Sequence, residues 1–530
     1  MAGAYHAETF TAAERAVLAR HVSDVDSPVF VLTNLPQVTC AALFARYSRS
    51  AKSLRRLLLD EFLSADAARV APPLAAEAGR ARASDLFGRV LAEYGDDSVA
   101  QLAGVHVACE QVSQPLAKAI EWGRLAGYLE QSTRYIAYSD QRDGHYRYYR
   151  DPELLASPHG EDYVVAMDGL FDAYIALLDP LRAHLDATLP EESDEAARRR
   201  AVRALALDLL RGILPAATVS NVGVFASPQA LEQLVLRLRA HRLPEARAYA
   251  ERLNAQLQGV IPEFLTRLDR PDRGGAWVHY LRETARELQG DAATLAPEHE
   301  WGPEGVTLVD WNRDGENRIL AAALFPHSHA SEERLLAAVR PLSAARRQAL
   351  FTAAVGDRHN RRHRPGRGFE HCEYTFEVIS DYGAFRDIQR HRMLTIQWQE
   401  LTPALGYAIP RELEDAGLAA RWRDAVSAAE AAHHRIAVHF PQQAQYLVTL
   451  GHRVRYLIKL NAREAMHLIE LRTSPQGHPS YRRVCQEMHR LIDEVAGHHL
   501  VAGAMRFVGS DDVHLPRYDA EAARIGTAGD

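Results

Sequence analysis

The chain has 530 residues, of which 47% are hydrophobic and 25% are charged, which is the composition of an ordinary globular protein and excludes a fibrous or wholly disordered chain. At this length we expect about two to four domains. The formal net charge is −7, there is no Cys-x-x-Cys pair, and no apolar run is long enough to span a bilayer. We therefore expect a cytoplasmic protein in a reducing compartment, without nucleic-acid or membrane partners.

The spacing of apolar residues predicts a chain made mostly of helix. A first short strand is expected over 30–33, followed by helices wherever Ala, Leu, Arg and Glu dominate and apolar residues recur three and four positions apart. Those helices are expected at 165–188, 195–212, 228–258, 332–355, 411–436 and 484–505. Two more strands are expected over 306–310 and 374–379, the second because ring and polar side chains alternate there. Together these elements predict an α+β fold.

A break near 268–276 divides the chain into two parts. Its sequence, Leu268-Asp-Arg-Pro-Asp-Arg-Gly-Gly, interrupts both the apolar rhythm and any helix. We expect one domain over 1–270, a second over 275–510, and a loosely held tail over 511–530.

The two parts share short patterns. Glu121-Trp-Gly-Arg124 in the first corresponds to Gln389-Arg-His-Arg392 in the second, and each part later has a Leu-Arg step, at Arg237 and at Arg472. Overall identity between the parts is low. An internal duplication is plausible on these grounds.

The sharpest local cluster is Arg390-His391-Arg392. Two planar guanidinium groups beside an imidazole suit an anion or a flat heteroaromatic ring, and Glu370-His371 lies just upstream. These residues could form the polar pocket of a charged cofactor. A solvated helix start with ordinary salt bridges explains them equally well when they are taken alone.

A second cluster is Glu130-Gln-Ser132-Thr-Arg134-Tyr135. A hydroxyl and a guanidinium two residues apart can both reach one phosphate. An N-cap serine followed by a surface arginine is the simpler interpretation of this segment alone, and the residues favour it.

A third cluster runs from Asn461 to Arg472. Arg463 and His467 are four residues apart and would share one face of a helix, with Arg472 at its end aimed into a cleft. Arginine and histidine at helical spacing are more often solvated, so this interpretation also stays open.

The remaining motifs are less specific. The basic run Arg358–Arg367 could hold phosphates or an oligonucleotide, but a loop edging the pocket before Glu370 is favoured. The 25 histidines include no His-Glu-x-x-His pattern, so no metal site is expected. Glycine-rich nucleotide loops and a Gly-x-Ser-x-Gly elbow are also missing, which counts against a Rossmann domain, a P-loop NTPase and a standard hydrolase.

Taken in this order, the segments resemble the flavin-dependent thymidylate synthase family. Its signature is Arg-His-Arg-x-x-Ser-x-Asn-x-x-Ser-x-Arg, often with Glu before the second Ser. The second part of the chain is similar over about 305–505, through Phe369-Glu-His, Arg390-His-Arg, Asn461-Ala-Arg and Leu471-Arg472. The first part is similar over about 95–255, through Glu130-Gln-Ser-Thr-Arg-Tyr, Arg211-Gly-Ile-Leu-Pro215 and Leu236-Arg237.

Neither part carries the complete signature. In the first, Trp122-Gly123 replaces Arg-His. In the second, Glu400 and Thr402 replace the later Ser and Arg. One part keeps the phosphate end and the other keeps the flavin end, so the resemblance implies sites composed from both parts.

The resemblance also implies a fold and a set of roles. The fold would be like that of the thymidylate synthase complementing proteins: two related helix-rich domains, each with a small, mostly antiparallel sheet covered by helices, fused in tandem. The residues implied to bind FAD are Arg390, His391, Arg392, Glu370, His371, Asn461, Arg463 and His467. The residues implied to bind the nucleotide are Glu130, Ser132, Arg134, Tyr135 and Arg211, with Arg472 and Arg237 as the catalytic arginines that polarise the pyrimidine.

By resemblance, the chain is a thymidylate synthase that methylates dUMP to dTMP with FAD as cofactor and with methylene-tetrahydrofolate and NADPH as co-substrates. Two chains would pair as a homodimer that forms a pseudo-tetramer. Two alternatives stay open, a flavoenzyme acting on another pyrimidine nucleotide and a non-catalytic nucleotide-binding relative. Glu400 favours the first alternative, since a carboxylate there would repel a phosphate.

Overall fold

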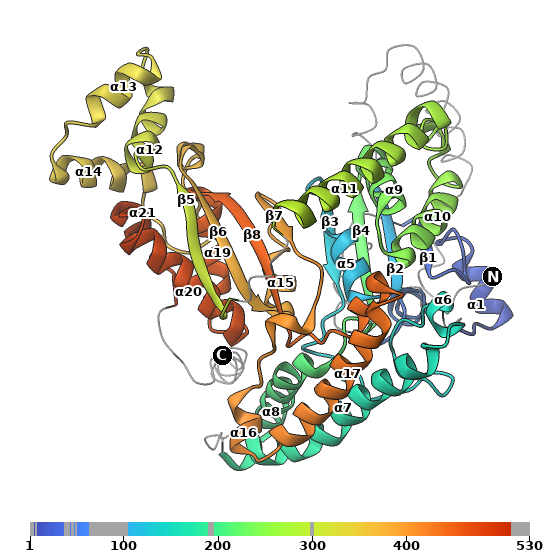
Figure 1. Cartoon of the computed structure of the whole chain (residues 1–530). Coiled ribbons are helices and arrows are strands. Elements are labelled where there is room, and N and C mark those ends of the chain that lie inside the picture. Colours follow the sequence, from blue (N-terminus) through green and yellow to red (C-terminus); the bar gives the residue numbers. More distant parts are fainter. Residues whose placement is uncertain are drawn as a thin grey trace. The chain divides into compact units, whose positions relative to one another are not determined.

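The computed structural model describes residues 5, 8–35, 43, 47, 50–62, 104–188, 195–296 and 302–509 (Figure 1). The chain is α+β, as predicted, and it forms two compact units. Unit 1 comprises Met1–Ile175, Leu214–Glu300 and Arg423–Val448, and unit 2 comprises Ala176–Ile213, Trp301–Trp422 and Thr449–Asp530. The tail expected over 511–530 lies outside the described residues, as does the loop at 189–194.

The compact units differ from the two sequence halves at two segments. Ala176–Ile213, from the first half, belongs to unit 2, and Arg423–Val448, from the second half, belongs to unit 1. The transfers begin inside two long helices, α7 (Gly160–Thr188) and α17 (Ala419–Ala437). The seam near 270 still separates the strands of the two sheets.

Unit 1 contains one four-stranded sheet. Its helices and strands are α1 (Ala12–Leu18), β1 (Val29–Leu32), α3 (Leu54–Leu57), β2 (Val105–Val112), α5 (Gln114–Ile120), β3 (Ala126–Glu130), α6 (Pro152–Leu155), β4 (Ser220–Ala226), α9 (Pro228–Ala240), α10 (Pro244–Gln258), α11 (Ala276–Leu295) and α18 (Pro441–Ala444). The strand order is β1-β2-β4-β3, and every neighbouring pair is antiparallel.

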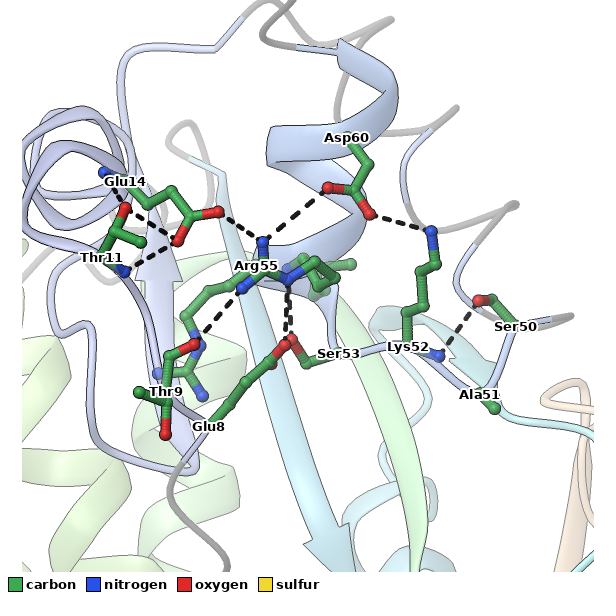
Figure 2. A network of polar contacts seen from close by, with 12 residues as sticks. Glu8, Thr9, Thr11, Glu14, Ser50, Ala51, Lys52, Ser53, Arg55 and Asp60 are labelled. Atoms are coloured by element: carbon green, nitrogen blue, oxygen red, sulfur yellow. Dashed lines mark hydrogen bonds and ion pairs between the residues drawn. The ribbon is translucent and has the colours of Figure 1, made fainter. Parts of the chain in front are cut away.

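A polar network joins the N-terminal segment of unit 1 to α3 and the turn after it (Figure 2). Thr11 and Glu14 form a capping box at the start of α1, because each side chain accepts a backbone N–H of the other. Glu14 also accepts a hydrogen bond from Arg56 at 2.6 Å, and Lys52 donates to Asp60 at 2.8 Å. The same region holds an apolar cluster of Phe10, Leu18, Val22, Phe30, Leu32, Leu43, Tyr47, Leu54, Leu57, Leu58 and Ala108.

Unit 2 repeats the sheet of unit 1. Its helices and strands are α8 (Glu195–Leu210), β5 (Gly305–Trp311), α12 (Gly315–Leu324), α13 (Glu332–Val339), α14 (Ala344–Val355), β6 (Glu373–Asp381), α15 (Tyr382–Ile388), β7 (Leu394–Trp398), α16 (Arg411–Asp415), β8 (Arg453–Asn461), α19 (Ala462–Arg472), α20 (Pro479–Glu494) and α21 (His499–Ala504). The order β5-β6-β8-β7 is antiparallel throughout and matches that of unit 1 strand for strand. This correspondence supports the predicted tandem duplication.

Alternation of side chains explains how the unit 2 sheet is covered. On β6, Tyr374, Phe376 and Val378 are fully buried, while the residues between them are more exposed. Helix α20 packs on β5 and β6, and α19 packs on α20. The ends of β6 and β8 lead directly into α15 and α19, which carry the residues of the candidate site.

The six predicted helical stretches are all helical, but four are each divided in two. The stretch 228–258 breaks before Pro244, and 332–355 breaks at Pro341, because proline lacks the N–H that a helix interior needs. Helix α7, by contrast, continues through Pro180. The stretches 411–436 and 484–505 break at Gly417 and Gly497, whose φ angles are +70° and +69°. Glycine adopts this left-handed conformation at no steric cost.

The three predicted strands are present as β1, β5 and β6, but β2, β3, β4, β7 and β8 were not predicted. The expectation that the seam at 268–276 breaks any helix is wrong, because Pro271–Gly275 forms one π-helical turn that continues into α11. Gly274 is required in this turn, since a Cβ there would lie 2.0 Å from the carbonyl oxygen of Leu268.

Candidate functional site

The centre of the candidate site is a buried carboxylate among three arginines. Asp387 lies in the last turn of α15, and its side chain faces Nη1 of Arg211 at 3.4 Å, of Arg390 at 3.6 Å and of Arg472 at 3.8 Å. The four groups carry three positive charges against one negative charge. A cluster with this excess of positive charge can bind a dianion such as a phosphate monoester.

Beside this centre, His391 is held between an acid and an arginine. Its Nδ1 lies 2.9 Å from Glu464, and its Nε2 accepts a hydrogen bond from Nε of Arg472 at 3.0 Å. Burial lowers the pKa of His391 to about 4, with a further contribution from Arg472, and the hydrogen bond to Glu464 only partly offsets this. The ring is therefore neutral at physiological pH.

Glu464 also contacts His467 at 3.2 Å, one turn along α19. Burial acts to raise the pKa of Glu464, but the hydrogen bonds from His391 and His467 outweigh it and lower the pKa to about 2. The ligand atoms of these three residues lie within 4.8 Å of one another, a spacing at which they could hold a metal ion. The hydrogen bonds account for this grouping by themselves, and we assign no metal to it.

A second group of predicted flavin ligands lies around η8, the 3-10 turn Arg367–His371. Glu370 pairs with Arg367 at 3.0 Å and with Arg463 at 3.4 Å, and Arg463 also donates to the carbonyl oxygen of Pro365 at 2.8 Å. These contacts hold Arg463 with its guanidinium partly exposed. It remains able to bind an anion.

The other predicted flavin ligands differ in their exposure and in the contacts that they already make within the protein. His371 is exposed and lies 3.9 Å from Glu332. Asn461 is the N-cap of α19, and its side-chain oxygen accepts the N–H of Glu464 at 2.9 Å. Arg392 is half-buried after α15. Asn461 and His391 therefore make their hydrogen bonds to other residues of the protein.

A cavity of about 400 Å³ in unit 2 opens beside Arg211. Arg211 is only 3% exposed, and its Nη2 has no hydrogen-bond partner among the described residues. Ser480, in the first turn of α20, and Asp381 also line the cavity. An unsatisfied buried guanidinium N–H at a cavity wall is costly, so this wall favours an anionic or strongly accepting ligand.

Asp381 has two roles at that wall. Its side chain caps α15 by accepting the N–H of Ala384 at 2.9 Å. Burial raises the pKa of Asp381, although the charge of Arg211 and a hydrogen bond from Ser480 act in the opposite direction.

Four of the five predicted nucleotide ligands, Glu130, Ser132, Arg134 and Tyr135, lie in unit 1 around the turn after β3, whereas Arg211 lies in unit 2. Glu130 is buried and pairs with Lys118 at 3.0 Å. Ser132 accepts the backbone N–H of Arg134 at 3.2 Å, which is the local turn bond considered above, and Tyr135 is exposed. These four residues are neighbours in sequence, and their role in binding the nucleotide stays a prediction.

Arg237, the other predicted catalytic arginine, lies on α9 of unit 1. Its guanidinium is 5.6 Å from the ring centre of Trp122. Burial lowers the pKa of Arg237, and Nε makes no hydrogen bond to a described residue. Unlike Arg472, Arg237 has no carboxylate within ion-pair distance in the described part of the chain.

The basic run Arg358–Arg367 is anchored at its first residue. Arg358 is buried, pairs with Glu470 on α19, and donates to the carbonyl oxygen of His363 at 2.6 Å. Arg362 and Arg364 are exposed. The segment is thus an exposed basic loop with a buried attachment.

Two functional residues were missed from the sequence, Asp387 and Glu464. Asp387 precedes Arg390 by three residues, and Glu464 precedes His467 by three residues on α19. The spacing of Glu464 and His467 places both on one face of α19, so that signal was present, whereas Arg390 lies beyond the end of α15 at Ile388. The position of Arg211 beside Asp387 had no local signal, because it depends on contacts between residues far apart in the chain.

Comparisons with known proteins agree on one family. A family model described as "Thymidylate synthase complementing protein" matches residues 34–263 and 307–497. A UPF0159 protein of Chlamydia muridarum is 37% identical over 97% of this chain and 98% of its own length. UPF0159 proteins of Chlamydia pneumoniae and Thermoplasma acidophilum are 36% and 30% identical, over 98% and 92% of this chain and 99% of each relative.

One solved structure is similar at a lower level. It is described as a UMP/dUMP methylase, PolB, from Streptomyces cacaoi bound with 5-Br dUMP, and it is 17% identical, with a TM-score of 0.30, over 39% of this chain and 95% of its own. A likeness at that TM-score carries no inference about this chain. Within the described residues, no helix has both the length and the apolar character needed to cross a membrane.

Proposed function

Because this chain belongs to the thymidylate synthase complementing protein family, we propose that it is a flavin-dependent thymidylate synthase-like enzyme that methylates dUMP to dTMP. Methylene-tetrahydrofolate would supply the carbon and NADPH the reducing equivalents. The site would be composed from both halves of the sequence. Two chains would pair as a homodimer that forms a pseudo-tetramer, as the resemblance of the chain to this family implies.

One observation carries the proposal. Arg211, from the phosphate-binding pattern of the first half, lies in unit 2 within 3.4 Å of Asp387. Arg390 and Arg472, from the second half, contact the same carboxylate. Arg211 from the first half and Arg390 and Arg472 from the second half thus lie in one cluster, which supports a site composed from both halves.

The cluster has the chemistry of a nucleotide monophosphate site. The unsatisfied Nη2 of Arg211 can donate to a phosphate oxygen, and the adjoining cavity of about 400 Å³ is within the usual size of small-ligand sites. Arg472, which is 14% exposed, can donate to a pyrimidine carbonyl and stabilise charge that develops on it. These roles need no protein nucleophile.

The residues around α19 fit FAD in part. Arg390 and Arg463 keep 37% and 29% of their side-chain surface exposed, and guanidinium groups suit the diphosphate of a dinucleotide. His467 is also partly exposed. FAD, when bound, supplies hydride and one-carbon transfer chemistry. His391 and Asn461 would support this site from within.

The test is to purify the full chain, record its absorption between about 350 and 500 nm, and identify any cofactor released on denaturation. FAD in the protein, together with dTMP formed from dUMP, methylene-tetrahydrofolate and NADPH, would support the proposal. Protein that binds no FAD and forms no dTMP would refute it. In that case, retained binding of dUMP would favour the non-catalytic relative.

A second substrate is favoured by one residue. The carboxylate of Asp387 could accept a hydrogen bond from an exocyclic amino group, which cytosine has and uracil lacks. The same assay should therefore include dCMP. Faster turnover of dCMP than of dUMP would assign the chain to the alternative flavoenzyme.

A further inference from the structure

The imidazole of His391 lies between Glu464, in the first turn of α19, and Arg472, the last residue of that helix. Glu464 lies 2.9 Å from Nδ1, and Nε of Arg472 donates to Nε2 at 3.0 Å. All three groups are largely enclosed, with side-chain exposures of 5% for Glu464, 2% for His391 and 14% for Arg472.

These contacts determine which nitrogen carries the proton. An arginine is always protonated and can only donate, so Nε2 of His391 must be an acceptor. The proton of the neutral ring is then on Nδ1, from which it is donated to Glu464. The carboxylate is in turn fixed by His467, at 3.2 Å, and by its place in the first turn of α19, which Asn461 caps.

The contacts of Arg472 are few. The one hydrogen bond that its side chain makes to a described residue runs from Nε to His391, and Asp387 faces Nη1 at the longer distance of 3.8 Å. The ring of Tyr481 lies 5.5 Å from its guanidinium carbon. The direction of the guanidinium plane therefore depends mainly on His391.

We propose that Glu464 and His391 are positioning residues: Glu464 fixes the Nδ1–H tautomer of His391, and His391 then holds the guanidinium of Arg472 toward the nucleotide. The role of Arg472 itself rests on the proposed function. This arrangement is the same in principle as a carboxylate that orients a histidine, but here the oriented group is an arginine.

The variants separate positioning from folding. H391Q keeps an acceptor that can reach Arg472, whereas H391F fills the space and has none. E464Q keeps the shape of the acid but lacks its charge. H489Q is the matched control, because His489 is also partly buried but bonds to the carbonyl oxygen of Ala502.

The first measurement does not depend on activity. Nitrogen-15 NMR of the full chain, labelled at histidine and arginine, should show the His391 ring neutral, with its proton on Nδ1, at about pH 6 to 8. A slowly exchanging Nε–H signal of Arg472 should persist in H391Q and H489Q and disappear in H391F. A proton on Nε2, or an Arg472 signal unchanged in H391F, would overturn the proposal.

The second measurement is kinetic. H391F should lower kcat for dTMP formation about 100-fold, the scale expected when a catalytic group is displaced by about 1 Å, with KM for dUMP changed far less. H391Q should recover most of the loss. Equal losses in H391Q and H391F would overturn the proposal. If the wild-type chain forms no dTMP, the proposed function fails, while the NMR result still decides the positioning.

Discussion

Arg358 and Glu470 form a buried ion pair that attaches the basic loop to α19. Nη1 of Arg358 lies 2.8 Å from the carboxylate, and the side-chain exposures are 3% and 0%. Arg358 also donates to the carbonyl oxygen of Ala504 at 3.0 Å. Both charged groups are therefore buried, and water cannot take the place of either partner in the ion pair.

Removing one member of this pair should destabilise unit 2. E470Q leaves the Arg358 charge buried without a counter-ion, which typically costs about 3–5 kcal/mol. The measurement is the free energy of unfolding in urea, followed by fluorescence. The control is E487Q, which removes an exposed partner of Arg490 and should cost less than about 1 kcal/mol. Equal effects of the two substitutions would contradict the buried pairing.

Arg211 should determine affinity for the nucleotide phosphate. R211K keeps the charge but loses the planar pair of donors, so Kd for dUMP should rise about 10-fold or more while FAD content stays the same. Equilibrium dialysis measures the change, and R490K, on the exposed face of α20, is the control. An unchanged Kd in folded R211K would mean that the phosphate does not bind at Arg211.

The exposed arginines of the basic loop should attract anionic co-substrates. Replacing Arg362 and Arg364 together by Gln should raise KM for NADPH about 3- to 10-fold at low salt and leave kcat unchanged. The difference should shrink as salt increases, because exposed charges are screened. Replacing Arg334 and Arg346, on α13 and α14, is the control. A defect that persists at high salt would point to a folding effect instead.

Glu245 should make unit 1 less stable as pH rises. Burial raises its pKa to about 7, although hydrogen bonds from Ser113 and Tyr446 act to lower it. The folded state therefore holds a proton that the unfolded state releases above its ordinary pKa of 4.5, so stability falls between about pH 4.5 and 7. The loss is about 3 kcal/mol for a shift of this size.

E245Q tests this prediction, because glutamine resembles the protonated acid. The variant should unfold at higher urea concentration than wild type at pH 8, with a smaller difference at pH 5. E251Q, on the exposed face of α10, should leave the pH profile unchanged. Parallel profiles for E245Q and wild type would show that Glu245 does not titrate in this range.

The sequence predicted the helices better than the strands for a physical reason. Apolar spacing over a long segment identified α7, α8 and α17, while β2 and β8 were missed because short apolar strands give a weak pattern. The ends of the helices near Pro244 and Gly417 were predictable, because proline and glycine commonly end helices. The carboxylate of Glu464 was predictable from its helical spacing to His467, whereas Arg390 lies beyond the helix that carries Asp387.

The location of Arg211 was not predictable in the same way. Its motif lies in the first half, yet η4 (Arg211–Ile213) belongs to unit 2, where Gly212 contacts Gly451 and Trp422. No local property of the segment 176–213 indicates this. The resemblance implied a composite site, but the pairing of Arg211 with Asp387 required the fold.

The exchange of Ala176–Ile213 and Arg423–Val448 between the units has a consequence for the gene. Each unit is completed by a segment encoded in the opposite half, so neither half encodes a whole unit. A truncation at residue 270 would leave both products with missing packing partners, and only co-expression of the two pieces could restore them. Because each unit needs a segment from the opposite half, loss of either half of the gene would remove part of both units.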